Sequence, residues 1–215
     1  LEGWHLTDND SRLTKWTFPS TILQPQQQLI VFASSCTVPG HDCPAASTEL
    51  HTNFSLSAGG EYLALVQPDG VEIASEFGSG DSDYPRQFED ISYGLSSEGG
   101  DIRYFPQPTP GHSNENGFLG FVSATRFSVD RGFFDRPFDV TVSSDTPGAT
   151  VIYTTDGSLP ASGNGVEIRA VDENSLPSAV ITVETTTYLR AIAVKNGFLP
   201  TNVDTQSYIF LDDVI

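Results

Sequence analysis

Paired carboxylates are the residues of this sequence best suited to chemistry. They occur in three short acidic clusters, Asp8-Asn9-Asp10, Asp81-Ser82-Asp83 and Asp212-Asp213. Because Ca²⁺ takes about six to eight oxygen ligands from flexible loops, the candidate calcium ligands are Asp8, Asp10, Asp81 and Asp83. None of the clusters matches an EF-hand loop, and short aspartate runs are more often solvated turns. We therefore expect no cofactor, with calcium as the ion to test.

Two cysteines, Cys36 and Cys43, lie in the segment CTVPGHDC. The favoured interpretation is a local disulfide, which would stabilise the fold by roughly 2–3 kcal/mol through loop closure. The alternative is a zinc site that adds His41 and His51. Structural zinc usually takes cysteines about two to four residues apart, and this pair is wider. A disulfide would indicate an oxidising compartment.

Aromatic side chains are the groups through which the chain could bind a polysaccharide. Trp16 lies in the alternating segment TKWTF and is the candidate ligand contact, with burial and exposure equally compatible with the pattern. Trp4 is expected in a core, because large aromatic side chains usually fill cores. Phe133 and Phe134 are expected to pack at a domain junction rather than to form an exposed patch.

Nothing in the sequence indicates a catalytic site. An enzyme needs acid, base or nucleophilic groups that converge in one cavity, and the four histidines are scattered along the chain. Gly78-Ser79-Gly80 has neither the third glycine nor the following helix of a dinucleotide-binding motif. We predict that the chain is not an enzyme and that hydrolysis assays show no turnover.

The charge balance excludes several partners. The 215 residues hold 10 basic and 28 acidic side chains, for a net charge of −18. Such a surface repels nucleic acid and anionic membranes. The longest apolar run, LIVFA at 29–33, is far shorter than the ~18 residues of a membrane-spanning helix. We therefore expect neither nucleic-acid binding nor membrane insertion.

Segments typical of β-strands alternate with segments typical of turns along the whole chain. These elements must position the acidic, cysteine and aromatic side chains described above. In the segment from Ala149 to Pro160, a β-branched strand runs into Asp156-Gly157, a dipeptide that tolerates a tight turn. Glu61–Val66 and the strand from Val71 flank Pro68-Asp69-Gly70, which predicts a hairpin. Its alternation places Ala64 and Val66 on one face and Leu63 and Leu65 on the other.

Further strands are predicted on both sides of a linker at 107–117. Gln28–Phe32 is expected to form a buried strand. Residues 138–143 alternate, with Phe138, Val140 and Val142 on one face, and 187–197 place Leu189, Ala191 and Ala193 together. Many short strands without helices between them predict an all-β fold of two antiparallel sandwiches, divided near residue 117.

The two halves each resemble a known domain family. The first resembles a bacterial lamin-tail domain, an immunoglobulin-like sandwich, in GWHLTDNDSRLTKWTFP, LIVFAS, LHTNFSLSAGGEYLALVQPDG, DISYG and PTPGHSN. The second is similar to the C-terminal sandwich of chitobiase-type hexosaminidases in GATVIYTTDGSLP, ITVETTTYLRAIAVKNGFLP and SYIF. The resemblance implies two tandem immunoglobulin-like antiparallel β-sandwiches, 1–117 and 118–215, neither of which carries catalytic residues.

Two departures from these families carry expectations. Lamin-tail domains open with strands before the GW motif, whereas this sequence begins almost at it, at Leu1, and holds no methionine. We expect a fragment whose first sandwich lacks its leading strands and exposes an edge near Gly3–Thr7, which another chain could fill by strand addition. Gly165–Ala179 is longer than the family link and is expected to be either a special loop or a surface excursion.

Together these features predict a non-catalytic module pair from a secreted or cell-surface protein, acting in adhesion, spacing or presentation of a neighbouring domain. The tandem resembles the segment before a spore-coat-protein-H-like kinase domain in planctomycete-type secreted proteins. The alternatives are a carbohydrate-binding module and a subunit of an extracellular fibre or surface layer. The expected partners are other domains of the parent protein, a polysaccharide, or like subunits through an open sheet edge.

Overall fold

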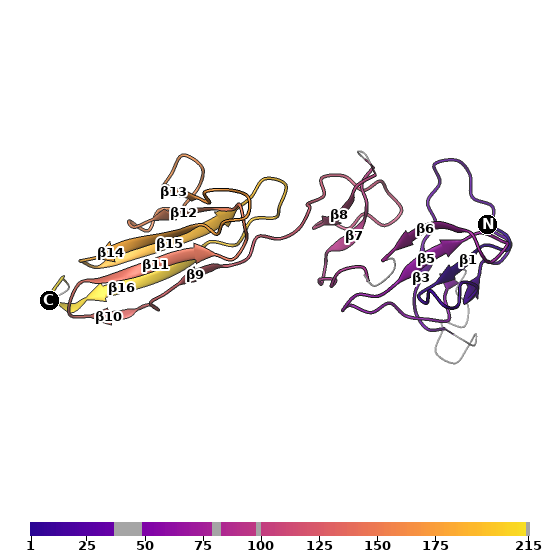
Figure 1. The fold of residues 1–215 in the computed structure, drawn as a ribbon, viewed down its shortest axis with the longest axis horizontal. Helices are drawn as coiled ribbons and strands as arrows, with labels where there is room; N and C mark the ends of the chain where they lie inside the picture. Colours follow the sequence, from indigo (N-terminus) through magenta and orange to yellow (C-terminus); the bar gives the residue numbers. More distant parts are fainter. Residues whose placement is uncertain (37–48, 79–82, 98–99, 214–215) are drawn as a thin grey trace. The chain divides into compact units, whose positions relative to one another are not determined.

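The computed structural model describes residues 1–36, 49–78, 83–97 and 100–213. The chain separates into two compact units, Leu1–Gly117 and Phe118–Ile215 (Figure 1). In the described residues the regular elements are strands and one short 3₁₀ helix, η1 (Leu211–Asp213). The fold is therefore all-β, as the strand-and-turn pattern predicted.

Long apolar helices are missing from the described part of the chain. No helix there has the length and the apolar character that a bilayer crossing requires.

The described residues of the first unit form eight strands. They are β1 (His5–Thr7), β2 (Trp16–Thr17), β3 (Val31–Phe32), β4 (Leu50–His51), β5 (Leu63–Val66), β6 (Ile73–Phe77), β7 (Ser92–Leu95) and β8 (Ile102–Phe105). The largest sheet is antiparallel and has the order β2-β1-β5-β6. β3 and β4 form a parallel pair, and β7 and β8 an antiparallel pair.

The predicted hairpin is confirmed as β5 and β6. Its turn is closed by Asp69, whose Oδ1 accepts hydrogen bonds from the backbone N–H groups of Val71 (2.9 Å) and Glu72 (3.0 Å). These two bonds favour the charged carboxylate and hold the pKa of Asp69 below its usual value. Ala64 and Val66 are buried, which is the face that the alternation assigned to them.

The expected open edge at Gly3–Thr7 is wrong. β1 lies between two neighbours, with Leu6 opposite Trp16 of β2 on one side and Leu65 of β5 on the other. The backbone of β1 is thus paired on both sides. The edges of this sheet are β2 and β6.

The prediction of a buried strand at Gln28–Phe32 is also wrong. Only Val31 and Phe32 form a strand, and Leu29, Ile30 and Phe32 remain 37%, 47% and 41% exposed. The reason is that β3 pairs only with the two-residue β4 and does not join the larger sheet. Among the described residues, the apolar run thus gains no further strand to cover it.

The second unit contains two sheets. Its strands are β9 (Thr125–Phe127), β10 (Gly132–Phe134), β11 (Phe138–Ser144), β12 (Thr150–Thr154), β13 (Val166–Arg169), β14 (Ser178–Val183), β15 (Thr187–Val194) and β16 (Asp204–Phe210). One sheet has the order β10-β16-β15-β12-β13 and the other β14-β11-β9. All neighbours are antiparallel except β10 and β16, which are parallel.

The core of the second unit confirms the predicted faces. Val140 and Val142 of β11 and Leu189, Ala191 and Ala193 of β15 are fully buried in one apolar cluster. β11 belongs to one sheet and β15 to the other, so the two inner faces pack against each other as in a sandwich.

Phe134 is half-buried and packs against this core. Its ring stacks on Phe138 at 4.1 Å between centroids and meets the edge of Tyr208 at 5.7 Å. The neighbouring Phe133 is 70% exposed, because successive side chains of β10 point to opposite faces. The expectation of packing at a domain junction is therefore wrong for Phe134, and for Phe133 it stays a prediction.

The segment Gly165–Ala179 is in part the expected surface excursion, because residues 170–177 form a mostly exposed turn segment between β13 and β14. Its first residues form β13, which pairs with β12 from Val166 opposite Tyr153 to Arg169 opposite Thr150. The insertion thus extends a sheet by one edge strand.

Candidate functional site

The candidate calcium ligands are not gathered into one site. Asp8 is paired with Lys15, whose Nζ lies 2.5 Å from its Oδ1, and Asp10 accepts a 3.1 Å hydrogen bond from the Ser11 hydroxyl. Asp83 is exposed, and Asp81 lies outside the described residues. Within the described ranges, no three acidic, histidine or cysteine side chains stand close enough to hold a metal ion.

The cysteine pair stays a prediction. Cys36 is the last described residue of the segment around β3, and its backbone N–H donates a 2.8 Å hydrogen bond to the carbonyl oxygen of Thr52. Cys43 and His41 lie outside the described residues. Neither the disulfide nor the alternative zinc site is therefore decided.

Trp16 anchors β2 rather than forming an open platform. It is half-buried, and its ring meets the buried ring of Phe18 edge-on, with the centroids 4.7 Å apart. Trp4, which was expected in the core, is also only half-buried. Trp16 thus offers at most part of one ring face to a ligand.

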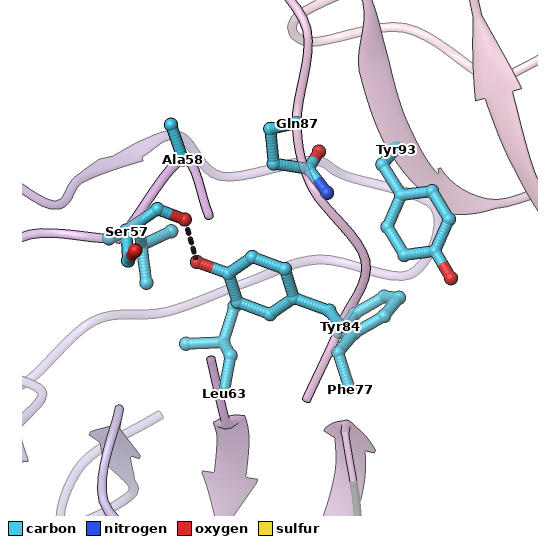
Figure 2. Close-up of a pocket in the computed structure, with 8 residues that line it drawn as sticks. Ser57, Ala58, Leu63, Phe77, Tyr84, Gln87 and Tyr93 are labelled. Carbon is cyan, nitrogen blue, oxygen red and sulfur yellow. Dashed lines mark hydrogen bonds between the residues drawn. The ribbon is translucent and has the colours of Figure 1, made fainter. Parts of the chain in front are cut away.

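The first unit instead contains an aromatic pocket of about 310 Å³, which we call the tyrosine pocket (Figure 2). Its lining residues are Leu56, Ser57, Ala58, Leu63, Phe77, Tyr84, Gln87 and Tyr93. The volume lies at the lower end of the range of about 300–1,000 Å³ found for small-molecule sites.

Strand pairing positions the apolar wall of the tyrosine pocket. Leu63 begins β5 and Phe77 ends β6, and the antiparallel register puts them opposite each other. Tyr93 comes from β7, and its ring lies 6.1 Å from that of Phe77 and 4.8 Å from that of Tyr104 on β8. The pocket is therefore built from two sheets of the same unit.

Tyr84 forms the fixed part of the wall. Its side chain is buried, and its hydroxyl donates a 2.9 Å hydrogen bond to the Ser57 carbonyl oxygen, with Glu61 Oε1 at 3.2 Å (Figure 2). The same Glu61 oxygen accepts a hydrogen bond from the Ser57 backbone N–H. Burial and the nearby Glu61 charge raise the pKa of Tyr84, so its hydroxyl stays protonated at neutral pH.

Polar groups of the tyrosine pocket suit binding rather than catalysis. Burial raises the pKa of Tyr93 as well, which keeps this hydroxyl a neutral hydrogen-bonding group. Gln87 is held by a 2.5 Å hydrogen bond from its Nε2 to the Pro85 carbonyl oxygen and by its backbone N–H on Ala58. The lining contains no nucleophile paired with a base.

Sequence reasoning missed this pocket, although it named Leu63 within the hairpin. The two tyrosines lie in different segments, one before Pro85 and one within β7, and no spacing rule connects them. The available signal was composition: four aromatic residues, Phe77, Tyr84, Phe88 and Tyr93, fall within a short stretch otherwise rich in turn residues, and three of them line the pocket.

Comparison with protein families identifies part of the second unit. Residues 129–205 match the family model of the chitobiase/beta-hexosaminidase C-terminal domain. This domain is a non-catalytic immunoglobulin-like module, and the match spans the sandwich from the end of β9 into β16. At the threshold we required, no curated protein and no solved structure matches the chain.

Proposed function

We propose that the chain is a non-catalytic module pair of a secreted or cell-surface multidomain protein, which acts in adhesion, spacing or presentation of a neighbouring domain. The observation that supports this most is the family match, because the matched domain is a non-catalytic module. Among the described residues of the second unit, the buried side chains of Ser144, Thr146 and Thr154 bond to its own backbone, and Thr125 bonds to Asp204. Ser144 Oγ, for example, donates 2.8 Å to the Ser123 carbonyl oxygen.

In this proposal the first unit is a lamin-tail-like module. Two of the stretches that resemble that family lie on its strands: LHTNFSLSAGGEYLALVQPDG runs from β4 through β5 into the following turn, and DISYG runs into β7. A kinase-like domain of the spore-coat-protein-H type would be the neighbour that the pair presents. The net charge of −18 suits a well-solvated exterior surface.

The test compares the parent protein with a form that lacks residues 1–215. We expect the neighbouring domain to keep its activity in solution, while the share of the protein retained at the cell surface falls. The isolated chain should show no hydrolase or phosphotransferase turnover. The proposal would be contradicted if the purified chain showed turnover and a single substitution in it abolished that turnover.

A second candidate function, carbohydrate binding, is favoured by the tyrosine pocket. Pyranose rings present C–H faces that pack on aromatic rings and hydroxyl groups that need hydrogen-bond partners. Phe77, Tyr84 and Tyr93 supply the rings, while Gln87 and the Tyr93 hydroxyl supply polar contacts. The pocket volume of about 310 Å³ leaves room for one sugar unit of a polysaccharide.

Affinity electrophoresis through gels that contain soluble chitin, cellulose, xylan or mannan derivatives tests this candidate. We expect one polysaccharide to retard the chain and Tyr93→Ala to abolish the retardation. Tyr188→Ala is the matched control, because Tyr188 is 50% exposed on the second unit and lines no part of this pocket. If none of the four polysaccharides retards the wild type or the control, carbohydrate binding in the tyrosine pocket is overturned.

A further inference from the structure

The strand β14 presents a free backbone edge in the second unit. It is the outer strand of the sheet β14-β11-β9, and all six of its residues pair with β11 on the inner side. Within the described part of the chain, no backbone hydrogen bond reaches its outer side. An unpaired strand edge is a row of N–H and C=O groups that another strand can bind.

The sequence of β14 is unusually permissive for such pairing. SAVITV holds no charged residue, proline or glycine, and its β-branched residues favour an extended backbone. Ile181 and Val183 point into the core, while Val180 points outward and is 65% exposed. Proteins usually protect such edges with charges, bulges or short strands.

The other edge strands of this unit carry that protection. β13 contains Glu167 and Arg169, which form a 2.9 Å ion pair, and β9 contains Arg126. β10 is three residues long and begins with Gly132. Among the edge strands of this unit, β14 therefore differs from the others in having neither a charged residue nor a short length.

We propose that β14 pairs in antiparallel orientation with β14 of a second copy of this chain, so that two three-stranded sheets join into one. Antiparallel pairing of identical strands follows a two-fold axis, the commonest symmetry of protein dimers. β14 offers no charge that would select an oppositely charged segment. A copy of itself presents the same neutral, β-branched residues, and no like charges oppose each other along the two strands.

The charge of the whole chain sets the conditions for this pairing. Two copies that each carry −18 repel each other, and salt shortens the range of that repulsion from about 10 Å at 0.1 M to about 3 Å at 1 M. A six-residue edge also buries less than the roughly 1,200–2,000 Å² of a stable interface. We therefore expect a weak dimer whose association strengthens with salt. This inference does not depend on the proposed adhesive or spacing role.

Sedimentation equilibrium of the full chain in 0.1 M and 1 M NaCl tests the pairing. The wild type should dimerise more strongly at high salt. Val180→Lys should weaken the dimer by about tenfold or more, because the two-fold axis brings the new charges close together. Val171→Lys is the matched control, since Val171 is 94% exposed and lies outside β14. It should dimerise as the wild type does.

Two further measurements test the pairing in case Val180→Lys fails to fold. Thr182→Lys places the new cation beside Asp139, which now accepts a 2.7 Å hydrogen bond from the Thr182 hydroxyl and would offset the new charge, so this variant should weaken the dimer less than Val180→Lys. Hydrogen exchange should show β14 amides that become protected as the protein concentration rises. A wild type that stays monomeric at both salt concentrations, or an equal effect of Val171→Lys, would overturn the proposal.

Discussion

The backbone N–H of Gly157 donates a 3.0 Å hydrogen bond to the carbonyl oxygen of Tyr188. The bond ties the turn after β12 to the start of β15, and Arg190 strengthens the tie by donating from Nη1 to the Gly157 carbonyl oxygen at 3.1 Å. Asp156 completes the turn by accepting two hydrogen bonds from Ser158, which lower the pKa of its carboxyl group. Asp156 is thereby a turn residue.

Replacement of this glycine tests the turn. Gly157 has a φ of +79°, and an added Cβ would lie 3.3 Å from Tyr188 Cβ. We expect Gly157→Val to destabilise the second unit by about 1–3 kcal/mol, measured by urea unfolding. Gly163→Val is the matched control, with a φ of +82° and nothing within 4 Å of its added Cβ, and should cost less. Equal costs would show that the contact with Tyr188 has no effect.

The buried face of β15 carries the second prediction. Leu189 is fully buried in the core cluster, so Leu189→Ala should lower the free energy of unfolding by about 2–5 kcal/mol. Leu159→Ala removes the same atoms from a side chain that is 60% exposed and should change it by less than about 0.5 kcal/mol. A loss at Leu189 no larger than that at Leu159 would refute the assignment of this core.

Alkaline pH gives a third prediction through Tyr208. Its hydroxyl donates a 2.8 Å hydrogen bond to the Val129 carbonyl oxygen, and burial, with the nearby Asp130, raises the pKa of Tyr208 to about 12. The unfolded chain then releases this proton near pH 10 while the folded chain retains it, so stability is full below about pH 10 and falls as the pH rises towards 12. Unfolding curves between pH 8 and 11.5 measure this slope.

The variant Tyr208→Phe separates the hydroxyl from the ring. It should cost about 1–3 kcal/mol at pH 8, because the half-buried Val129 carbonyl loses its partner, and it should flatten the alkaline slope of the second unit. An unchanged slope would mean that another group titrates there.

The cysteine pair is tested by intact mass and by melting. We expect the mass to rise by two hydrogens on reduction, and the first unit to melt at lower temperature, since opening the loop removes roughly 2–3 kcal/mol. The double variant Cys36→Ser with Cys43→Ser should reproduce the reduced melting curve without reductant. A mass that reductant leaves unchanged would exclude the disulfide.

Strand faces were predictable because they depend on local alternation. Val140 and Val142, or Leu189 and Ala191, lie two residues apart, and a pleated strand puts such neighbours on one face whatever the rest of the chain does. The hairpin at Asp69 was predictable for the same reason, since its strands and turn lie within one short segment.

Features that depend on distant pairing were not predictable. β3 is exposed because of a missing partner layer, and β1 is protected because both β2 and β5 reach it. The tyrosine pocket needs β6 and β7 to approach, and nothing near Phe77 or Tyr93 in the sequence specifies that approach. Alternation shows which face of a strand is buried, but not which strand covers it.

The parallel pairing of β10 with β16 has a mechanical consequence. These strands lie near the two ends of the second unit along the chain, and Phe133 pairs with Ile209 in the same direction. A tensile force that pulls the ends of the unit apart would drag the two strands past each other. All their hydrogen bonds would then bear the load together instead of opening one at a time. Such a connection resists stretching, which is useful to a link between two anchored bodies.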